Sequence, residues 1–400
     1  MTALLAFGNR LTKTSTWLVQ YILPTGWFAL LTGMFWIGDR ALYHKLYYLL
    51  LAAPTLLALL GRPRDIKDLF TSPLIAAFFL FGLYTAISLA WSSTDDAFGS
   101  LVKRPIYVLF LFFSAALLAQ QAPQRLLFSL KASAIFASLA GAAALGFHLY
   151  NGGAGRLSGY GALYNPLLSS HVYGFFAALW AGYWFNGKSV FNPLALISLS
   201  ILAVLLLETG SRTPIMALTA CLLWLVIAHW NRRSLIALAA VAVIGILLIN
   251  LYPDELTSRG LSSRPEIWGK AWLQILEAPW LGQGYDAPLS IWITAHNYAM
   301  ADPHNMLLAV LYYGGTVGLA LWLSLYAVAF IFAWRNRKVP SVMICSGLLV
   351  FGLAASMTEG GAFLSRPKEH WFLIWIPMAL LTATWFICRG KEQAREMEGT

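Results

Sequence analysis

Three short stretches of the chain carry side chains that could act together on a phosphorylated substrate held in a membrane. His304 stands between the longest polar segment and a long apolar run. Imidazole is the side chain best suited to accept a proton near neutral pH. Arg212 and Arg264 also precede apolar stretches, and guanidinium groups bind phosphate oxygens in pairs without losing their charge. One base and two fixed cations predict transfer of a group away from a lipid-linked phosphate.

Structural roles are also open for these three residues. His304 is one of seven histidines, all near predicted helix ends, and a histidine at an interface can simply extend to water. Arg212 follows Glu208 by four positions and could pair with it. Arg264 could pair with Glu266 or remain solvated. However, Arg264 begins a predicted amphipathic helix, whose first turn favours acids, so a bound anion would explain its position better.

Weaker candidates lie on the same predicted outer side of the membrane. Arg104, Arg156, Arg259 and Arg366 extend the set of outer arginines, and Asn305 adjoins His304. We interpret Arg104, Arg156, Arg259 and Asn305 as candidate secondary substrate contacts. The adjacent acids at 95 and 96 have no third ligand nearby, which is weak support for a metal site. We therefore expect no metal and no other cofactor.

The composition predicts that membrane helices position these side chains. The chain of 400 residues is 59% hydrophobic and 11% charged, whereas a soluble domain is nearer half apolar and a quarter charged. Apolar runs of about twenty residues are long enough to cross a bilayer as helices. Twelve such ranges occur, near 17–38, 41–60, 72–91, 103–119, 125–150, 167–186, 190–208, 211–229, 234–251, 303–333, 340–358 and 369–388. We expect an all-α integral membrane protein with a single domain over residues 1–400.

The distribution of charge predicts the orientation. The formal charge of +10 would suit nucleic acid, but with twelve spans 16 of the 27 basic residues fall on the side that holds both termini. The positive-inside rule makes that side cytoplasmic, so we expect no nucleic acid partner. The segment 252–302 then lies outside, between the ninth and tenth spans. Apolar residues at helical spacing predict an amphipathic helix over 267–277, suited to the membrane interface.

The sequence resembles the O-antigen ligases, within the ligase/polymerase superfamily of bacterial envelope proteins. The first matching block is Thr209-Gly210-Ser211-Arg212. The second begins with Ser263-Arg264-Pro265-Glu266-Ile267-Trp268 and ends with Pro279-Trp280-Leu281-Gly282-Gln283-Gly284. The third is Pro303-His304-Asn305-Met306-Leu307-Leu308, followed by Tyr313-Gly314-Gly315. In order, these blocks are fairly specific for the superfamily but separate its members poorly.

The resemblance implies a particular reaction. It implies a fold like that of the multi-span GT-C glycosyltransferases, with a large periplasmic loop, in the bacterial inner membrane. A glycan would leave undecaprenyl diphosphate and join lipid A–core, with His304 as base and with Arg212 and Arg264 on the diphosphate. Membrane lipids would surround the enzyme. We expect metal-independent transfer that inverts the anomeric centre.

Other functions that involve the same lipid-linked donor remain open. A polymerase or a protein O-oligosaccharyltransferase of the superfamily would use the same cations with another acceptor. A lipid-linked glycan transporter is a different class, and it would predict ionisable residues deep in the spans. Lys131, near the start of its helix, is about the deepest charge. This distribution favours chemistry at the outer face.

Overall fold

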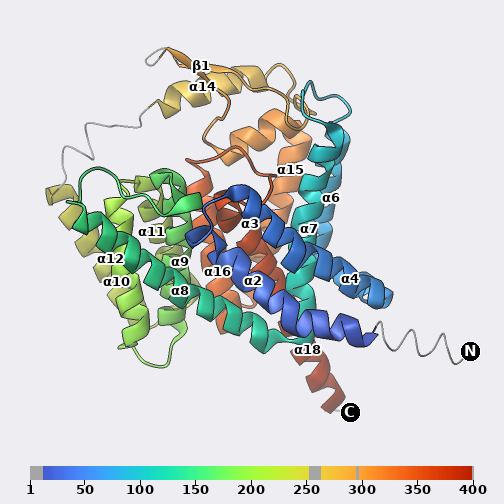
Figure 1. The fold of residues 1–400 in the computed structure, drawn as a ribbon, viewed down its shortest axis with the longest axis horizontal. Helices are drawn as coiled ribbons and strands as arrows, with labels where there is room; N and C mark the ends of the chain where they lie inside the picture. The colour runs from blue at the N-terminus through green and yellow to red at the C-terminus, as the bar shows by residue number, and fades with distance from the viewer. Residues whose placement is uncertain (1–11, 252–262, 294–296, 399–400) are drawn as a thin grey trace, which may run out of the picture.

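The helices of the protein form a bundle that carries a smaller cap at one end. The computed structural model describes residues 12–251, 263–293 and 297–398. Figure 1 shows the cap, with α14 (Arg264–Ile275) and β1 (Ile291–Ile293), at the top of the bundle. At the opposite end of the bundle, α18 (Trp375–Glu398) extends downward. The cap and the helix ends beneath it therefore define one face of the molecule.

Each of the twelve predicted ranges contains a helix, so the prediction that these ranges are helical is confirmed. The remaining helices are α2 (Leu23–Thr32), α3 (Arg40–Tyr47), α4 (Ala53–Gly61), α5 (Pro63–Leu69), α6 (Pro73–Ser88), α7 (Phe98–Gln121), α8 (Pro123–Tyr150), α9 (Pro166–Asn186), α10 (Pro193–Glu208), α11 (Arg212–Ala228), α12 (Arg232–Leu251), α15 (Met306–Arg335), α16 (Pro340–Ser356) and α17 (Glu369–Leu373). A π-helical turn joins α3 to α4. The largest helix contacts are those of α18 with α7 and of α11 with α16.

Length and apolar composition limit how many of these helices can cross a bilayer alone. In the described ranges six helices qualify, or seven if the bent pair α5 and α6 forms one span. Three further apolar helices, α10, α11 and α16, are shorter. The expected number of about twelve spans, and the GT-C-like arrangement, stay predictions.

Asparagine and proline start several of these helices. Asn165 and Asn192 precede α9 and α10, and their side chains accept hydrogen bonds from backbone amides of the first turn. Pro166 and Pro193 follow directly, at a position where no amide donor is needed. The same capping occurs at α15, where Asn305 accepts from Leu307 N and Leu308 N. The residue after His304 therefore fixes where α15 begins.

The cap has a small core of its own. The amphipathic helix predicted over 267–277 is confirmed as α14, which buries Ile267, Ala271 and Ile275. They pack with the buried Ile291 and Ile293 of β1, which pairs antiparallel with β2 (Tyr298–Met300). The sequence did not predict this hairpin, because each of its strands has only three residues. It is a small addition to an otherwise helical fold.

The cap is fastened to a break in α15. Gly315 has φ 59° within this helix, and Thr316 N donates to Pro279 O at 2.9 Å. A side chain on Gly315 would lie 2.3 Å from Trp280 O, and one on Gly282 would lie 2.5 Å from Gly315 N. Both positions therefore need glycine. Two of the sequence blocks that carry the family resemblance meet here.

Candidate functional site

A short segment after α16, residues 357–361, joins the elements that carry the candidate residues. Its backbone or side chains bond to the start of α14, to the turn before α15 and to the first turn of α11. The segment includes Glu359, which is 2% exposed. In Figure 1 it lies between the cap and the bundle. We call residues 357–361 the hub segment.

Arg264 binds the hub segment through two of its three guanidinium nitrogens. Its Nε and Nη2 donate to Thr358 O at 3.1 and 3.0 Å, and Nη2 also donates to Glu359 Oε1 at 2.7 Å. The expected alternative partner, Glu266, pairs with Lys270 at 2.7 Å instead. Ser263 occupies the N-cap position of α14, but its side chain makes no capping bond. Arg264 thus connects the cap to the bundle.

His304 lies on the other oxygen of the same carboxylate. Its Nδ1 is 3.6 Å from Glu359 Oε2, and its side chain is 29% exposed. The backbone of His304 has φ 47°, an uncommon conformation for a residue other than glycine. Asp302 holds this turn, because its carboxylate accepts from His304 N at 2.7 Å and from Gly361 N at 2.8 Å. Glu359 therefore brings an imidazole and a guanidinium together.

Asn305 supports the same turn from the opposite direction. Its Nδ2 donates to Met357 O at 3.0 Å while its Oδ1 caps α15. Both polar groups of the amide are engaged, so Asn305 joins the start of α15 to the hub segment. Its sequence-based role as a secondary substrate contact stays a prediction.

The first turn of α11 reaches the hub segment through Thr213. Its Oγ1 lies 3.0 Å from Thr358 Oγ1, and Arg212 is the preceding residue and the first of the helix. Glu208, the expected alternative partner of Arg212, lies with Oε2 3.6 Å from His148 Nε2. Arg156 braces the same turn by donating from Nε to Thr209 O at 2.7 Å. The turn that carries Arg212 is therefore held close to the hub segment.

Charges within the cluster set the protonation states. The Glu359 carboxylate raises the pKa of His304 above its ordinary value, against the opposing effect of burial, and Asp302 adds to the rise. Burial disfavours the charged form of Glu359, but His304, His171 and Arg264 together hold the pKa of this carboxyl below its usual range. The carboxylate is thus ionised, and His304 is a stronger base than an isolated histidine.

Two of the predicted residues lie elsewhere, and one lies outside the described residues. Arg104 donates to Asp286 Oδ1 at 2.8 Å and to Asp96 Oδ2 at 3.0 Å, which ties the cap to α7. Arg366 is exposed in the segment before α17. Arg259 falls in the range 252–262, outside the described residues. The secondary substrate contacts predicted for Arg104 and Arg259 stay predictions.

Glu359 is the residue that sequence reasoning missed. It lies in Thr358-Glu359-Gly360-Gly361, directly after an apolar helix. The signal that could have identified it is a lone acid followed by two glycines, at a helix end on the side predicted to be outer. Among the described ranges, no group of three His, Cys, Asp or Glu side chains is placed to hold a metal ion.

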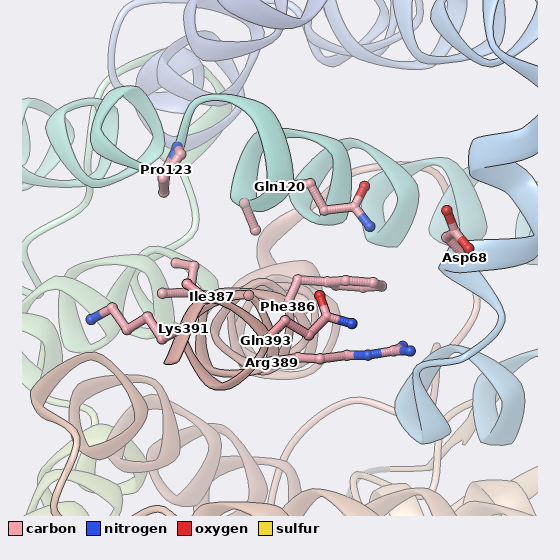
Figure 2. A pocket seen from close by; sticks show the side chains of 11 residues that line it. Asp68, Gln120, Pro123, Phe386, Ile387, Arg389, Lys391 and Gln393 are labelled. Atoms are coloured by element: carbon pink, nitrogen blue, oxygen red, sulfur yellow. The ribbon is translucent and has the colours of Figure 1, made fainter. Parts of the chain in front are cut away.

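A cavity lies at the other end of the bundle, away from this cluster. It has a volume of about 560 Å³ and is lined by residues of α5, α7 and α18, with Pro123 at the start of α8. Figure 2 shows Arg389 and Phe386 extending from α18 toward the side where Gln120 and Asp68 lie. None of the candidate residues lines this cavity, so its size alone does not make it the reactive site.

A bundle of apolar helices that gathers an imidazole, a guanidinium and a buried carboxylate at one end is the architecture of a membrane-embedded enzyme. A family model described as O-antigen ligase matches residues 197–323. The chain is also 54% identical over 372 residues to an O-antigen ligase of Pseudomonas aeruginosa, across 93% of this chain and 92% of that protein. The chain therefore belongs to the O-antigen ligase family, and it is a multi-pass membrane enzyme.

Proposed function

We propose that this enzyme transfers O-antigen glycan from undecaprenyl diphosphate to lipid A–core at the periplasmic face of the inner membrane. The relative is named as an O-antigen ligase. The single observation that supports the chemistry is the contact of both Arg264 and His304 with Glu359. Three distant segments contribute one cation, one base and one carboxylate to the same place.

Each residue has a distinct role in the proposed reaction. Because Nδ1 of His304 is directed at Glu359, its Nε2 is the nitrogen that accepts the proton of the acceptor hydroxyl. The hydroxyl oxygen then bonds to the anomeric carbon as the bond to the diphosphate oxygen breaks. Glu359 stabilises the imidazolium that forms, as a carboxylate does beside a catalytic histidine. Glu359 and Asp302 are positioning residues.

Arg264 and Arg212 hold the diphosphate as its charge develops. In the described part of the protein, Nη1 of Arg264 bonds to no other residue, and the side chain is 27% exposed. This nitrogen is available to a phosphate oxygen without loss of the Glu359 contact. Donors aimed at a developing anion lower the barrier by about 3–4 kcal/mol each. Displacement from the face opposite the diphosphate inverts the anomeric centre, and no metal is needed for charge neutralisation.

Transfer by purified protein tests this proposal. The assay uses a defined undecaprenyl-diphosphate-linked glycan and a panel of acceptors, with and without excess chelator. The expected product is glycan on lipid A–core in both conditions. Loss of transfer that a divalent ion restores would refute metal independence. Transfer only to a second lipid-linked repeat would identify a polymerase, and transfer to a protein would identify an oligosaccharyltransferase.

A further inference from the structure

A second group of basic residues lies beside the hub segment and is not used by the proposed chemistry. Arg40, at the start of α3, forms an ion pair with Glu369, which is completely buried. His44 follows one helical turn later. Arg366 and Lys368 come from the segment just before α17. We call Arg40, His44, Arg366 and Lys368 the Arg40 face.

The members of the Arg40 face are close in space although they come from distant segments. The Pro367 carbonyl contacts the His44 imidazole, and the charges of Arg366 and Arg40 act on the same ring. Figure 1 shows the segment between α16 and α17 near α3, in agreement with the Arg40–Glu369 pair. Two guanidinium groups, those of Arg40 and Arg366, and the Lys368 amine, whose pKa burial lowers, oppose the carboxylates of Asp39 and Glu369. The balance is positive on a side where the charge distribution predicts few basic residues.

An exposed aromatic ring borders these cations. The guanidinium of Arg40 lies 5.2 Å from the centre of the Tyr164 ring. The loop that carries this ring is hydrogen-bonded to the segment just before α3, because Ala162 N donates to Ile37 O at 3.1 Å. Tyr160 and Tyr164 are 70% and 62% exposed. Flat apolar rings beside guanidinium groups suit a phosphorylated sugar, whose ring packs on the aromatics while its phosphate meets the cations.

The Arg40 face is connected to the reactive cluster by the chain itself. Glu369 precedes His370, and a methyl group added to Gly360 would lie 1.8 Å from His370 Nε2. Gly360 in turn follows Glu359. The hub segment thus uses Thr358 and Glu359 to bind Arg264, and packs its next residue against His370. A ligand on the Arg40 face would be held by α3 and the segment before α17, whereas a ligand of Arg264 would be held by α14. Both would lie near Glu359.

We infer that the Arg40 face binds a phosphate group on the core sugars of the acceptor. This inference rests on the proposed function, in which Arg264 and Arg212 are occupied by the diphosphate of the donor. Because the incoming hydroxyl and the leaving diphosphate lie on opposite sides of the reacting carbon, the two substrates need separate anion sites. The Arg40 face is the second site. It selects acceptors by charge, whereas His304 acts on their hydroxyl group.

The test compares two acceptors in transfer by the purified full-length enzyme. One acceptor is lipid A–core with phosphorylated core sugars, and the other lacks only those phosphates and keeps the phosphates of lipid A. The variants are Arg366→Gln and Lys368→Gln, because removal of Arg40 would leave buried Glu369 without its partner. Lys103→Gln, an exposed cation at the start of α7, is the matched control.

The expected result is a rise in KM for the phosphorylated acceptor of about tenfold in each variant, the effect of one lost charge-assisted hydrogen bond. The kcat and the KM for the donor stay unchanged, Lys103→Gln behaves like the unaltered enzyme, and all proteins use the dephosphorylated acceptor equally. An equal loss with both acceptors, a change in donor KM, or no loss at all would overturn the inference. Failure of the unaltered enzyme to glycosylate either acceptor would instead overturn the proposed function.

Discussion

Glu359 Oε1 accepts a hydrogen bond from Arg264 Nη2 at 2.7 Å, although 95 positions separate the two residues. The carboxylate is almost completely buried, whereas the guanidinium is partly exposed. A buried carboxylate needs a partner, because an unpaired charge in a poorly hydrated site is strongly unfavourable. The pair therefore fixes the cap on the bundle and also places a cation beside His304 at the candidate site.

We expect Arg264→Ala to lower both transfer and stability. Loss of the cation removes a donor to the diphosphate, worth about 10²–10³-fold in kcat. It also leaves the buried Glu359 without its nearest charged partner, at a cost of about 3–5 kcal/mol in unfolding free energy. Adding Glu359→Gln should restore much of the stability and none of the transfer. Thermal unfolding and transfer rates of the single and double variants measure this. Normal turnover by Arg264→Ala would exclude its role at the diphosphate.

Arg212→Ala should weaken use of the donor most. The first turn of α11 is held at the hub segment by Thr213, so the change removes a cation without removing that contact. We expect a raised KM for the lipid-linked donor and an unchanged KM for the acceptor. Arg156→Gln provides a comparison, since Arg156 bonds to the backbone of the same turn. An unchanged donor KM in Arg212→Ala would contradict the assignment.

His304→Ala should lower kcat by about 10²–10⁴-fold, the usual contribution of a positioned general base. Donor binding should persist, because Arg264 keeps its bonds to Thr358 and Glu359. Single-turnover transfer and equilibrium binding of the lipid-linked donor separate the two effects. Retention of the normal kcat would show that another group accepts the proton.

The pH dependence of transfer should report the Glu359–His304 contact. The carboxylate raises the pKa of His304, so the protonated imidazole, which cannot act as a base, persists to higher pH. Transfer should rise with pH as the proton leaves. In Glu359→Gln the pKa of His304 falls, and the acidic limb of the kcat profile should move to lower pH. The pH profile measures this, and an unmoved or upward-shifted limb would contradict the positioning role of Glu359.

Gly315→Ala should destabilise the junction between the cap and α15. The left-handed backbone at Gly315 and the nearby Trp280 carbonyl leave no room for a methyl group, at a cost of about 1–3 kcal/mol. Thermal unfolding of the purified protein measures the effect. Gly146→Ala is the control, because a side chain added there meets nothing within 4 Å. Equal stability of the two variants would mean that the break in α15 is not constrained by the cap.

The sequence predicted the helices because their signal is local. Long apolar runs, together with Asn165 and Pro166 at a helix start, specify a helix without reference to the rest of the chain. The amphipathic α14 followed from the spacing of Ile267, Ala271 and Ile275 in the same way. The hairpin of β1 and β2 was missed because its strands are too short to show an alternating pattern.

The site was predicted only in part, because its contacts are long-range. His304 and Arg264 were identified by residue type and position, yet the only partner within the chain that was considered for Arg264 was its neighbour Glu266. The real partners, Thr358 O and Glu359, include a backbone carbonyl, which has no residue-specific signal. Arg104 illustrates the same limit, since its bond to Asp286 spans 182 positions.

The backbone at His304 gives a practical means of trapping the enzyme with its substrates. Its φ of 47° is a conformation that asparagine tolerates better than most residues. His304→Asn would therefore delete the proton acceptor while the turn at the start of α15 keeps its shape. An inactive protein with an unaltered backbone around Glu359 is the right specimen for imaging donor and acceptor bound at the same time.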